Sequence, residues 1–151
     1  MLFRSLGVVI LQLVYGAFTA GLHAGRLANT FPTMDGEWIP GGIHVMSPAY
    51  LNFFENLLTV QFIHRTLAYT LVALIFFLWW TTRKMNLAGG QKKSILICLA
   101  AVCVQFLLGV FTLLYHVPVA LGALHQAGGF FLFSSVITAL FFFSKMKLVT
   151  E

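Results

Sequence analysis

Four long apolar runs dominate the chain, and polar segments separate them. They cover approximately residues 5–22, 57–80, 94–115 and 122–143. A helix needs about 20 residues to cross the hydrocarbon core of a bilayer, because each residue adds about 1.5 Å of length. All four runs reach that length within about one turn. The pattern therefore predicts an all-α membrane protein, with one four-helix transmembrane domain over residues 1–151.

The first apolar run follows Arg4 and could be a cleaved signal peptide. Its apolar part is longer than the roughly 7–15 residues typical of such peptides. It is also interrupted by Gln12, Tyr15 and Thr19. We therefore expect a retained transmembrane helix.

The composition favours a bilayer over an aqueous environment. Hydrophobic residues make up 60% of the chain and charged residues only 9%, whereas soluble domains carry about 25% charged residues. The net charge of +5 would suit a nucleic-acid-binding protein. However, the basic residues lie between the apolar runs, where they determine membrane topology. We expect a membrane protein with no nucleic-acid partner.

Positive charge is distributed unevenly between the two sides of the predicted bundle. Most basic residues fall on one side if all four runs span, namely Arg4, Arg83, Lys84, Lys92, Lys93, Lys145 and Lys147. Only Arg26 and Arg65 fall toward the other side. The positive-inside rule then predicts an antiparallel bundle in the cell inner (plasma) membrane with both termini in the cytoplasm. Segments 25–56 and 116–121 would face outward.

The outer segment 25–56 is long for a simple connector, and such loops are usually functional or disordered. Pro32, Pro40 and Pro48 oppose long regular structure, although residues 48–56 could form a short helix on the membrane surface. Its aromatic and apolar residues argue against disorder. We expect a lid over the outward mouth of the bundle, with a plain connector as the alternative.

Two histidines, His64 and His125, lie inside apolar runs. An imidazole in hydrocarbon needs a partner, because lipid offers its nitrogens no hydrogen bond. His64 lies about 10 Å below the outer end of its helix at helical rise, and His125 lies about one turn into a helix that runs the opposite way. Both therefore lie toward the outer face at similar depth. We expect them to bind a heme iron from both sides, as in electron-transfer or structural hemes.

Polar neighbours of the two histidines are further candidates. Gln61 and Gln126 could accept the second ring N–H of a ligating histidine. Arg65 could bind a heme propionate through its guanidinium, or it could extend to lipid headgroups. Zinc is the rival metal, but no tight cluster of histidine, cysteine and carboxylate residues favours it.

Small and polar residues predict which helix faces meet. The face on the first helix is formed by Gln12, Tyr15 or Gly16, Thr19 and His23. The face on the third helix is formed by Gln105, Gly109 and Thr112. For Gly109 we expect close helix packing. Gly122 and Gly128, beside His125, fit either close packing or space for a flat macrocycle. The remaining histidines lie at helix ends or in loops, where solvent can satisfy them.

Several motifs, in this order, resemble the heme A synthase family. The runs GAFTAGLHAG (16–25) and NTFPTMDG (29–36) look like its first helix and outer loop. The motifs QFIHR (61–65) and HQ (125–126) look like its two histidine helices. The resemblance covers about residues 16–131.

The resemblance implies a role in cytochrome c oxidase assembly. Members of this family are usually eight-helix proteins made of two similar halves, and they oxidise a methyl group of heme O to the formyl group of heme A. This chain resembles the C-terminal half, in which a heme b lies between two histidines that match His64 and His125. The catalytic half has a glutamate where Gln61 stands here, and an amide cannot act as a carboxylate acid or base.

Two functions follow from this resemblance. The first is a half-size heme A synthase, an oxidoreductase that binds heme b and works as a homo-oligomer or with a second catalytic half. Heme O and heme A would then be its substrate and product. The alternative is a non-enzymatic b-type cytochrome or heme-handling assembly factor, with catalysis in a partner.

Overall fold

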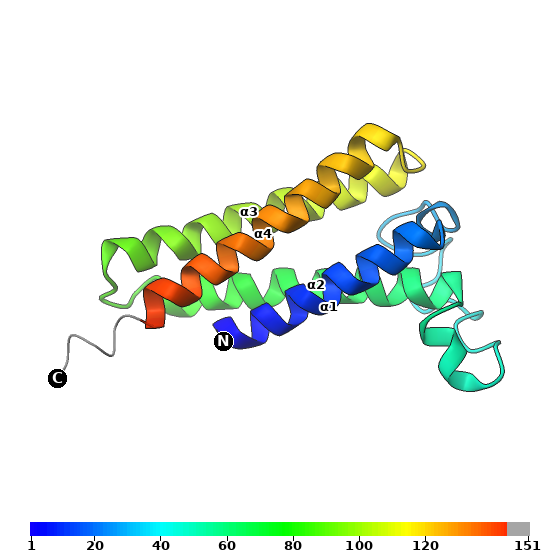
Figure 1. Ribbon diagram of the computed structural model, residues 1–151, viewed down its shortest axis with the longest axis horizontal. Coiled ribbons are helices and arrows are strands. Elements are labelled where there is room, and N and C mark those ends of the chain that lie inside the picture. Colours follow the sequence, from blue (N-terminus) through cyan, green and yellow to red (C-terminus); the bar gives the residue numbers. More distant parts are fainter. Residues whose placement is uncertain (145–151) are drawn as a thin grey trace.

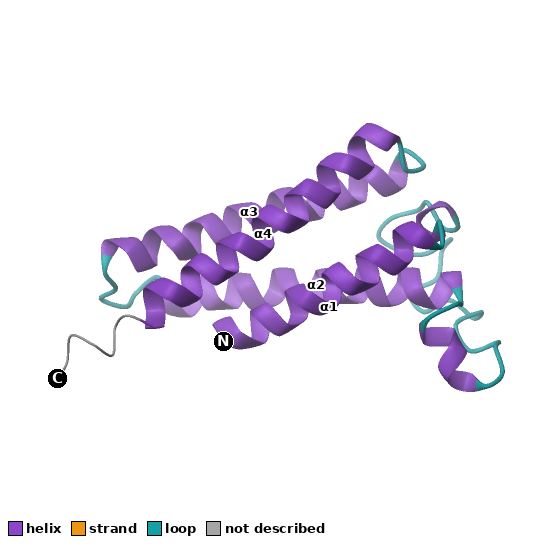
Figure 2. Cartoon of the chain, in the orientation of Figure 1, coloured by secondary structure: helices purple, strands orange, loops and turns teal. Residues whose placement is uncertain are grey.

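The computed structural model describes residues 1–144, and helices account for most of them (Figure 2). The long helices are α1 (Leu2–Gly21), α2 (Leu57–Thr82), α3 (Gly89–Leu114) and α4 (Val119–Ser144). All four are long and apolar enough to cross a membrane. The predicted transmembrane helices are therefore confirmed, with ends that differ by a few residues. Lys145 and Lys147, part of the topology prediction, lie outside the described residues.

The four helices form a bundle in which each packs mainly on two neighbours (Figure 1). α1 packs on α2 and α4, and α3 packs on the same two helices. α2 and α4 therefore lie diagonally across the bundle. Segment 22–56 and the α3–α4 connection lie toward one end of the bundle, and the α2–α3 connection lies toward the other (Figure 1).

Segment 22–56 is folded and contains two short 3₁₀ helices, η1 (Ala24–Arg26) and η2 (Ala49–Phe53). η2 confirms the short helix expected within residues 48–56. The Asn56 side chain then caps α2, because its Oδ1 accepts hydrogen bonds from the main-chain nitrogens of Leu58 and Thr59 at 3.0 and 3.3 Å. This cap satisfies donors that the first helical turn would leave unpaired.

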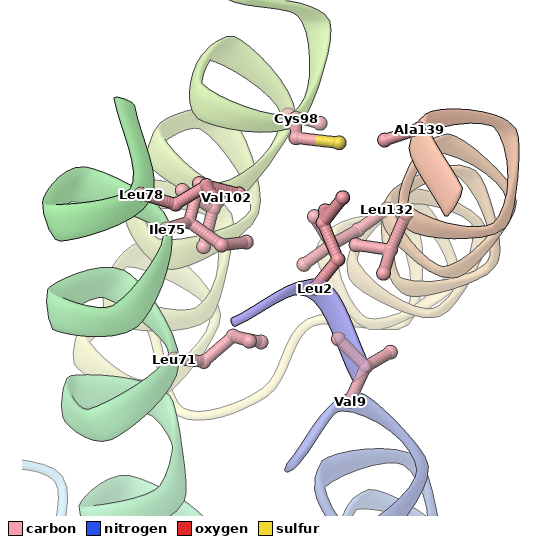
Figure 3. Packing of buried hydrophobic residues seen from close by; sticks show 11 residues of the cluster. Leu2, Val9, Leu71, Ile75, Leu78, Cys98, Val102, Leu132 and Ala139 are labelled. Carbon is pink, nitrogen blue, oxygen red and sulfur yellow. The ribbon is translucent and has the colours of Figure 1, made fainter. Parts of the chain in front are cut away.

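An apolar core fills the end of the bundle away from segment 22–56. All four helices contribute to it (Figure 3), through Leu2, Val9, Leu71, Ile75, Leu78, Cys98, Ala101, Val102, Leu132, Val136 and Ala139. Large apolar side chains such as Phe3 and Phe130 instead point outward and are exposed. An apolar outer surface of this kind suits contact with lipid.

Candidate functional site

The two predicted histidines meet inside the bundle, although they come from diagonal helices. His64 lies on α2 and His125 lies on α4. Their ring centroids are 6.4 Å apart, and the ring planes are inclined at 83°. This contact agrees with the prediction that His64 and His125 lie at the same depth in the bundle.

α1 lies against the His64 ring through two residues one turn apart. The Nε2 of Gln12 lies 3.2 Å from Nδ1 and 3.3 Å from Nε2 of His64. A Cβ added at Gly16 would lie 3.3 Å from Cε1 of the same ring. The glycine therefore lets α1 approach closely enough for Gln12 to hydrogen-bond the imidazole.

α3 bears the same relation to His125. A Cβ at Gly109 would lie only 2.8 Å from Cε1 of His125, closer than real side chains come. The Nε2 of Gln105 donates to the main-chain carbonyl of His125 at 2.8 Å. The expectation of close packing at Gly109 is met, and the group that packs against it is the imidazole.

A repeated motif could have identified Gln12 and Gln105 from the sequence. The pattern Gln-x-x-x-Gly-x-Phe-Thr-x-x-x-His begins in α1 and again in α3, and it ends just beyond each helix at His23 and His116. The structural details repeat as well, since both terminal histidines have left-handed backbone angles, with φ of 55° and 60°. Each motif helix precedes the helix whose histidine it contacts. The bundle therefore consists of two similar helical hairpins, each with one inward histidine.

Gln61 and Arg65 hold segment 22–56 rather than the His64 ring. The Nε2 of Gln61 donates to the carbonyl of Ala28 at 3.0 Å. The Arg65 guanidinium donates to the carbonyls of Ala28, Thr30 and Thr33 at 2.6, 2.9 and 3.1 Å. These bonds tie residues 28–33 onto α2 beside the histidine pair. They support the expectation of a lid and give Arg65 a partner other than a propionate or lipid headgroup.

The residues that flank His125 along α4 differ in their surroundings. Gln126 is exposed, and a Cβ at Gly122 would meet nothing within 4 Å. Gly128 instead lies against the side chain of Gln105. Gly128 therefore fits the close-packing alternative and Gly122 lies beside open space, while Gly109 is the glycine whose helix approaches the His125 ring.

The buried polar groups around the histidine pair are not fully satisfied. Within the part of the chain that the structure describes, the buried side-chain atoms without a hydrogen-bond partner are Gln12 Oε1, Gln61 Oε1, Arg65 Nε, Gln105 Oε1 and His125 Nδ1. All five belong to the residues just described. Native proteins rarely leave such atoms unpaired, because each one carries a desolvation penalty of about 1–3 kcal/mol. Their grouping favours a site that binds a polar or metal-containing ligand.

The separation of the two imidazole centroids is close to that of two imidazoles bound to one metal ion. An imidazole–metal bond is about 2 Å long, so two axial nitrogens on one metal lie about 4 Å apart and their ring centroids about 6 Å apart. The observed separation of 6.4 Å agrees with that value. Residues 1–144 contain no group of three or more histidine, cysteine or acidic residues able to hold a bare metal ion. A heme needs only the two axial ligands, because the porphyrin supplies the other four.

These features define the class of protein: a multi-pass, four-helix membrane protein with paired histidines from diagonal helices. A model of the COX15-CtaA family, described as cytochrome oxidase assembly protein, matches residues 1–137. The chain therefore belongs to this family.

Relatives in this family carry the name heme A synthase. The protein of Wolbachia pipientis wMel is 41% identical over 138 residues, covering 91% of this chain and 37% of the relative. That of Flavobacterium johnsoniae is 43% identical over 143 residues, covering 93% of this chain and 42% of the relative. Heme A synthase COX15 of Arabidopsis thaliana is 48% identical over 121 residues, covering 80% of this chain and 26% of the relative.

The chain thus spans about two fifths of the length of the bacterial relatives. This partial match fits the expectation that it corresponds to one half of a longer family member. No solved structure matches the chain.

Proposed function

We propose that this chain is a heme A synthase-type membrane protein that binds heme b between His64 and His125. In this role it takes part in the oxidation of the heme O methyl group to the formyl group of heme A. The observation that carries the proposal is the contact between the two imidazoles, whose centroids are 6.4 Å apart. Membership of a family whose relatives are named heme A synthase supports the reaction.

Different residues of the chain have different roles at this site. His64 and His125 would hold the heme iron, and Gly16 and Gly109 give their rings room. Iron held by two imidazoles supplies one-electron transfer when heme is bound. Gln61 and Arg65 tie residues 28–33 to α2 beside the site, where this segment would limit the access of water.

The helices cross the inner (plasma) membrane as an antiparallel bundle with both termini in the cytoplasm. This orientation rests on the basic residues around Arg4 and between α2 and α3. It places the histidine pair and residues 28–33 toward the outer face.

The oxidation requires a second component. Gln61 is buried and donates to Ala28, and its amide neither ionises nor transfers protons near neutral pH. Four helices also enclose one histidine pair, whereas the reaction needs a site for heme O besides the heme b. We therefore propose that the chain works as a homo-oligomer or with a separate catalytic half.

Heme binding is tested by the absorption spectrum of the purified protein and by extraction of its pigment. We expect heme b with a six-coordinate spectrum, and we expect His64→Ala and His125→Ala to lose most of it. His44→Ala is a suitable control, because His44 is exposed in segment 22–56. Unchanged heme content in both ligand variants would contradict the proposal.

The second candidate function is a non-enzymatic b-type cytochrome or heme-handling assembly factor. The amide at Gln61, in place of a carboxylate, favours this alternative. Expression in cells that supply heme O, with and without a candidate partner half, separates the two functions. Accumulation of heme A supports the enzyme, whereas bound heme b without conversion under either condition supports the cytochrome.

A further inference from the structure

The side chain that hydrogen-bonds the ring of His64 comes from α1 and not from the histidine's own helix. Gln12 Nε2 lies within 3.3 Å of both ring nitrogens, and Gly16 brings the α1 backbone close to the same edge of the ring. The amide and the glycine are one helical turn apart, so they present a single face of α1 to the imidazole.

A histidine that ligates iron through one nitrogen needs an acceptor for the N–H of the other nitrogen. The Gln61 side chain also has an unpaired Oε1, but its amide is held by the Ala28 carbonyl and makes no hydrogen bond to the His64 ring in the described structure. The Arg65 guanidinium has no acceptor atom and donates to main-chain carbonyls. Gln12 has the required acceptor, because its Oε1 is buried and has no partner. A half-turn of the amide about its Cγ–Cδ bond exchanges Oε1 with Nε2 and brings the oxygen to the imidazole.

We propose that Gln12 is the positioning residue of His64, holding the ring from α1 and accepting its N–H when the histidine ligates heme iron. This inference rests on the proposed heme-binding function. It adds that the electron density and orientation of one axial ligand are controlled from a neighbouring helix.

The internal repeat supplies a matched comparison within the same chain. Gln105 occupies the equivalent place in α3, one turn before Gly109, but its Nε2 donates to the main-chain carbonyl of His125. The two glutamines therefore have the same residue type, helix position and glycine neighbour. They differ in what the amide nitrogen contacts, which is a ring in one hairpin and a carbonyl in the other.

The test compares Gln12→Leu, Gln12→Glu and Gln105→Leu in the full chain purified with its heme. The measurements are the midpoint potential and the electron paramagnetic resonance spectrum of the ferric heme, which reports ligand orientation. Loss of the acceptor in Gln12→Leu reduces electron donation by His64, so we expect the ferric-to-ferrous preference to fall about tenfold. For a one-electron couple that change raises the potential by about 59 mV.

The other two variants have distinct expected results. Gln12→Glu accepts more strongly, so it should lower the potential below that of the wild type while restoring the wild-type resonance spectrum. Gln105→Leu should shift the potential by less than half as much as Gln12→Leu and leave the ligand orientation unchanged. If Gln12→Leu fails to fold, Gln12→Asn replaces it, because its amide is one methylene too short to reach the ring.

Unchanged potential and resonance spectrum in the Gln12 variants would overturn the inference, and so would equal shifts in Gln12→Leu and Gln105→Leu. A wild-type protein that binds no heme would overturn the proposed function separately. The hydrogen bond is then tested in that heme-free protein by the ¹⁵N resonances of the His64 ring. Gln12→Leu should shift these resonances and Gln105→Leu should not, and the reverse pattern would refute the role of Gln12.

Discussion

Buried polar groups at the two ends of the bundle make different hydrogen bonds. At the end with the apolar core, buried hydroxyls bond to carbonyls of their own helices. Thr82 donates to Leu78 at 2.6 Å and Ser135 to Leu132 at 2.7 Å. At the other end, amides and imidazoles contact one another across helices and leave several buried atoms unpaired.

This difference separates a region that holds the helices together from one suited to a ligand. Because the membrane interior contains no water, polar groups there form hydrogen bonds with their own helix or with a neighbouring group. The hydroxyls in the core need nothing further. The groups around His64 and His125 lack such partners, so we expect the ligand to bind at this end of the bundle.

The largest expected effect on stability comes from breaking the apolar end. Ile75 is fully buried, and Ile75→Ala should lower the free energy of unfolding by about 2–5 kcal/mol because it leaves a cavity. Thermal unfolding of the detergent-solubilised protein measures this loss. The heme spectrum of the remaining folded protein should be unchanged.

The control for this prediction is Ile97→Ala, because Ile97 lies on the outside of α3 and is 48% exposed. Its effect on the unfolding temperature should be small. A changed heme spectrum in Ile75→Ala would mean that the two ends of the bundle are not separate regions.

A methyl group added at the histidine end should lower the affinity for heme, a property that Ile75→Ala is expected to leave unchanged. Gly109→Ala would bring Cβ to 2.8 Å from the His125 ring, and Gly16→Ala would bring it to 3.3 Å from the His64 ring. Overpacking typically costs about 1–3 kcal/mol, so Gly109→Ala should weaken heme binding about tenfold or more. Gly16→Ala should have a smaller effect, and Gly122→Ala, which meets nothing within 4 Å, should have none. Equal heme affinity in all three variants would argue against glycine-made space around the rings.

The helices and the histidine pair could be predicted from the sequence because their signals are local. Apolar length defines a spanning helix, and an imidazole within such a run is conspicuous. The depth of His64 and His125 followed from helical rise and opposite chain direction. No longer-range information was needed for these features.

The partners of the histidines could not be predicted in the same way. Gln61 and Gln126 are the amides nearest to the histidines in the sequence, but the amides that contact the histidines are Gln12 and Gln105 on neighbouring helices. Which helices are adjacent depends on the packing of the whole bundle. The repeat shared by α1 and α3 is the sequence signal that could have indicated both residues.

A smaller, local effect should follow from removing the Arg65 side chain. Arg65→Met loses the hydrogen bonds to the carbonyls of residues 28, 30 and 33, so this segment should open more often. We expect at least tenfold faster amide hydrogen exchange over residues 28–33, equivalent to about 1.4 kcal/mol in local opening.

Arg65→Lys is the conservative variant, and it should recover only part of the protection because an ammonium cannot reproduce the guanidinium fork. Heme affinity should stay within a few-fold of the wild type in both variants. Heme loss without faster exchange in residues 28–33 would instead assign Arg65 to a propionate.

The smallest effect on heme binding is expected at Gln61, although it lies three residues before His64. Gln61→Glu preserves size and removes the amide that donates to Ala28, so the destabilisation should be confined to segment 22–56. Heme content should stay within about twofold of the wild type, equivalent to less than 1 kcal/mol, as measured by absorbance per protein. Since Gln61 contacts the loop and Gln12 contacts the ring, Gln12→Leu should change the ferric resonance spectrum and Gln61→Glu should not. A larger change of this spectrum in Gln61→Glu than in Gln12→Leu would mean that α2, and not α1, sets the orientation of the His64 ring.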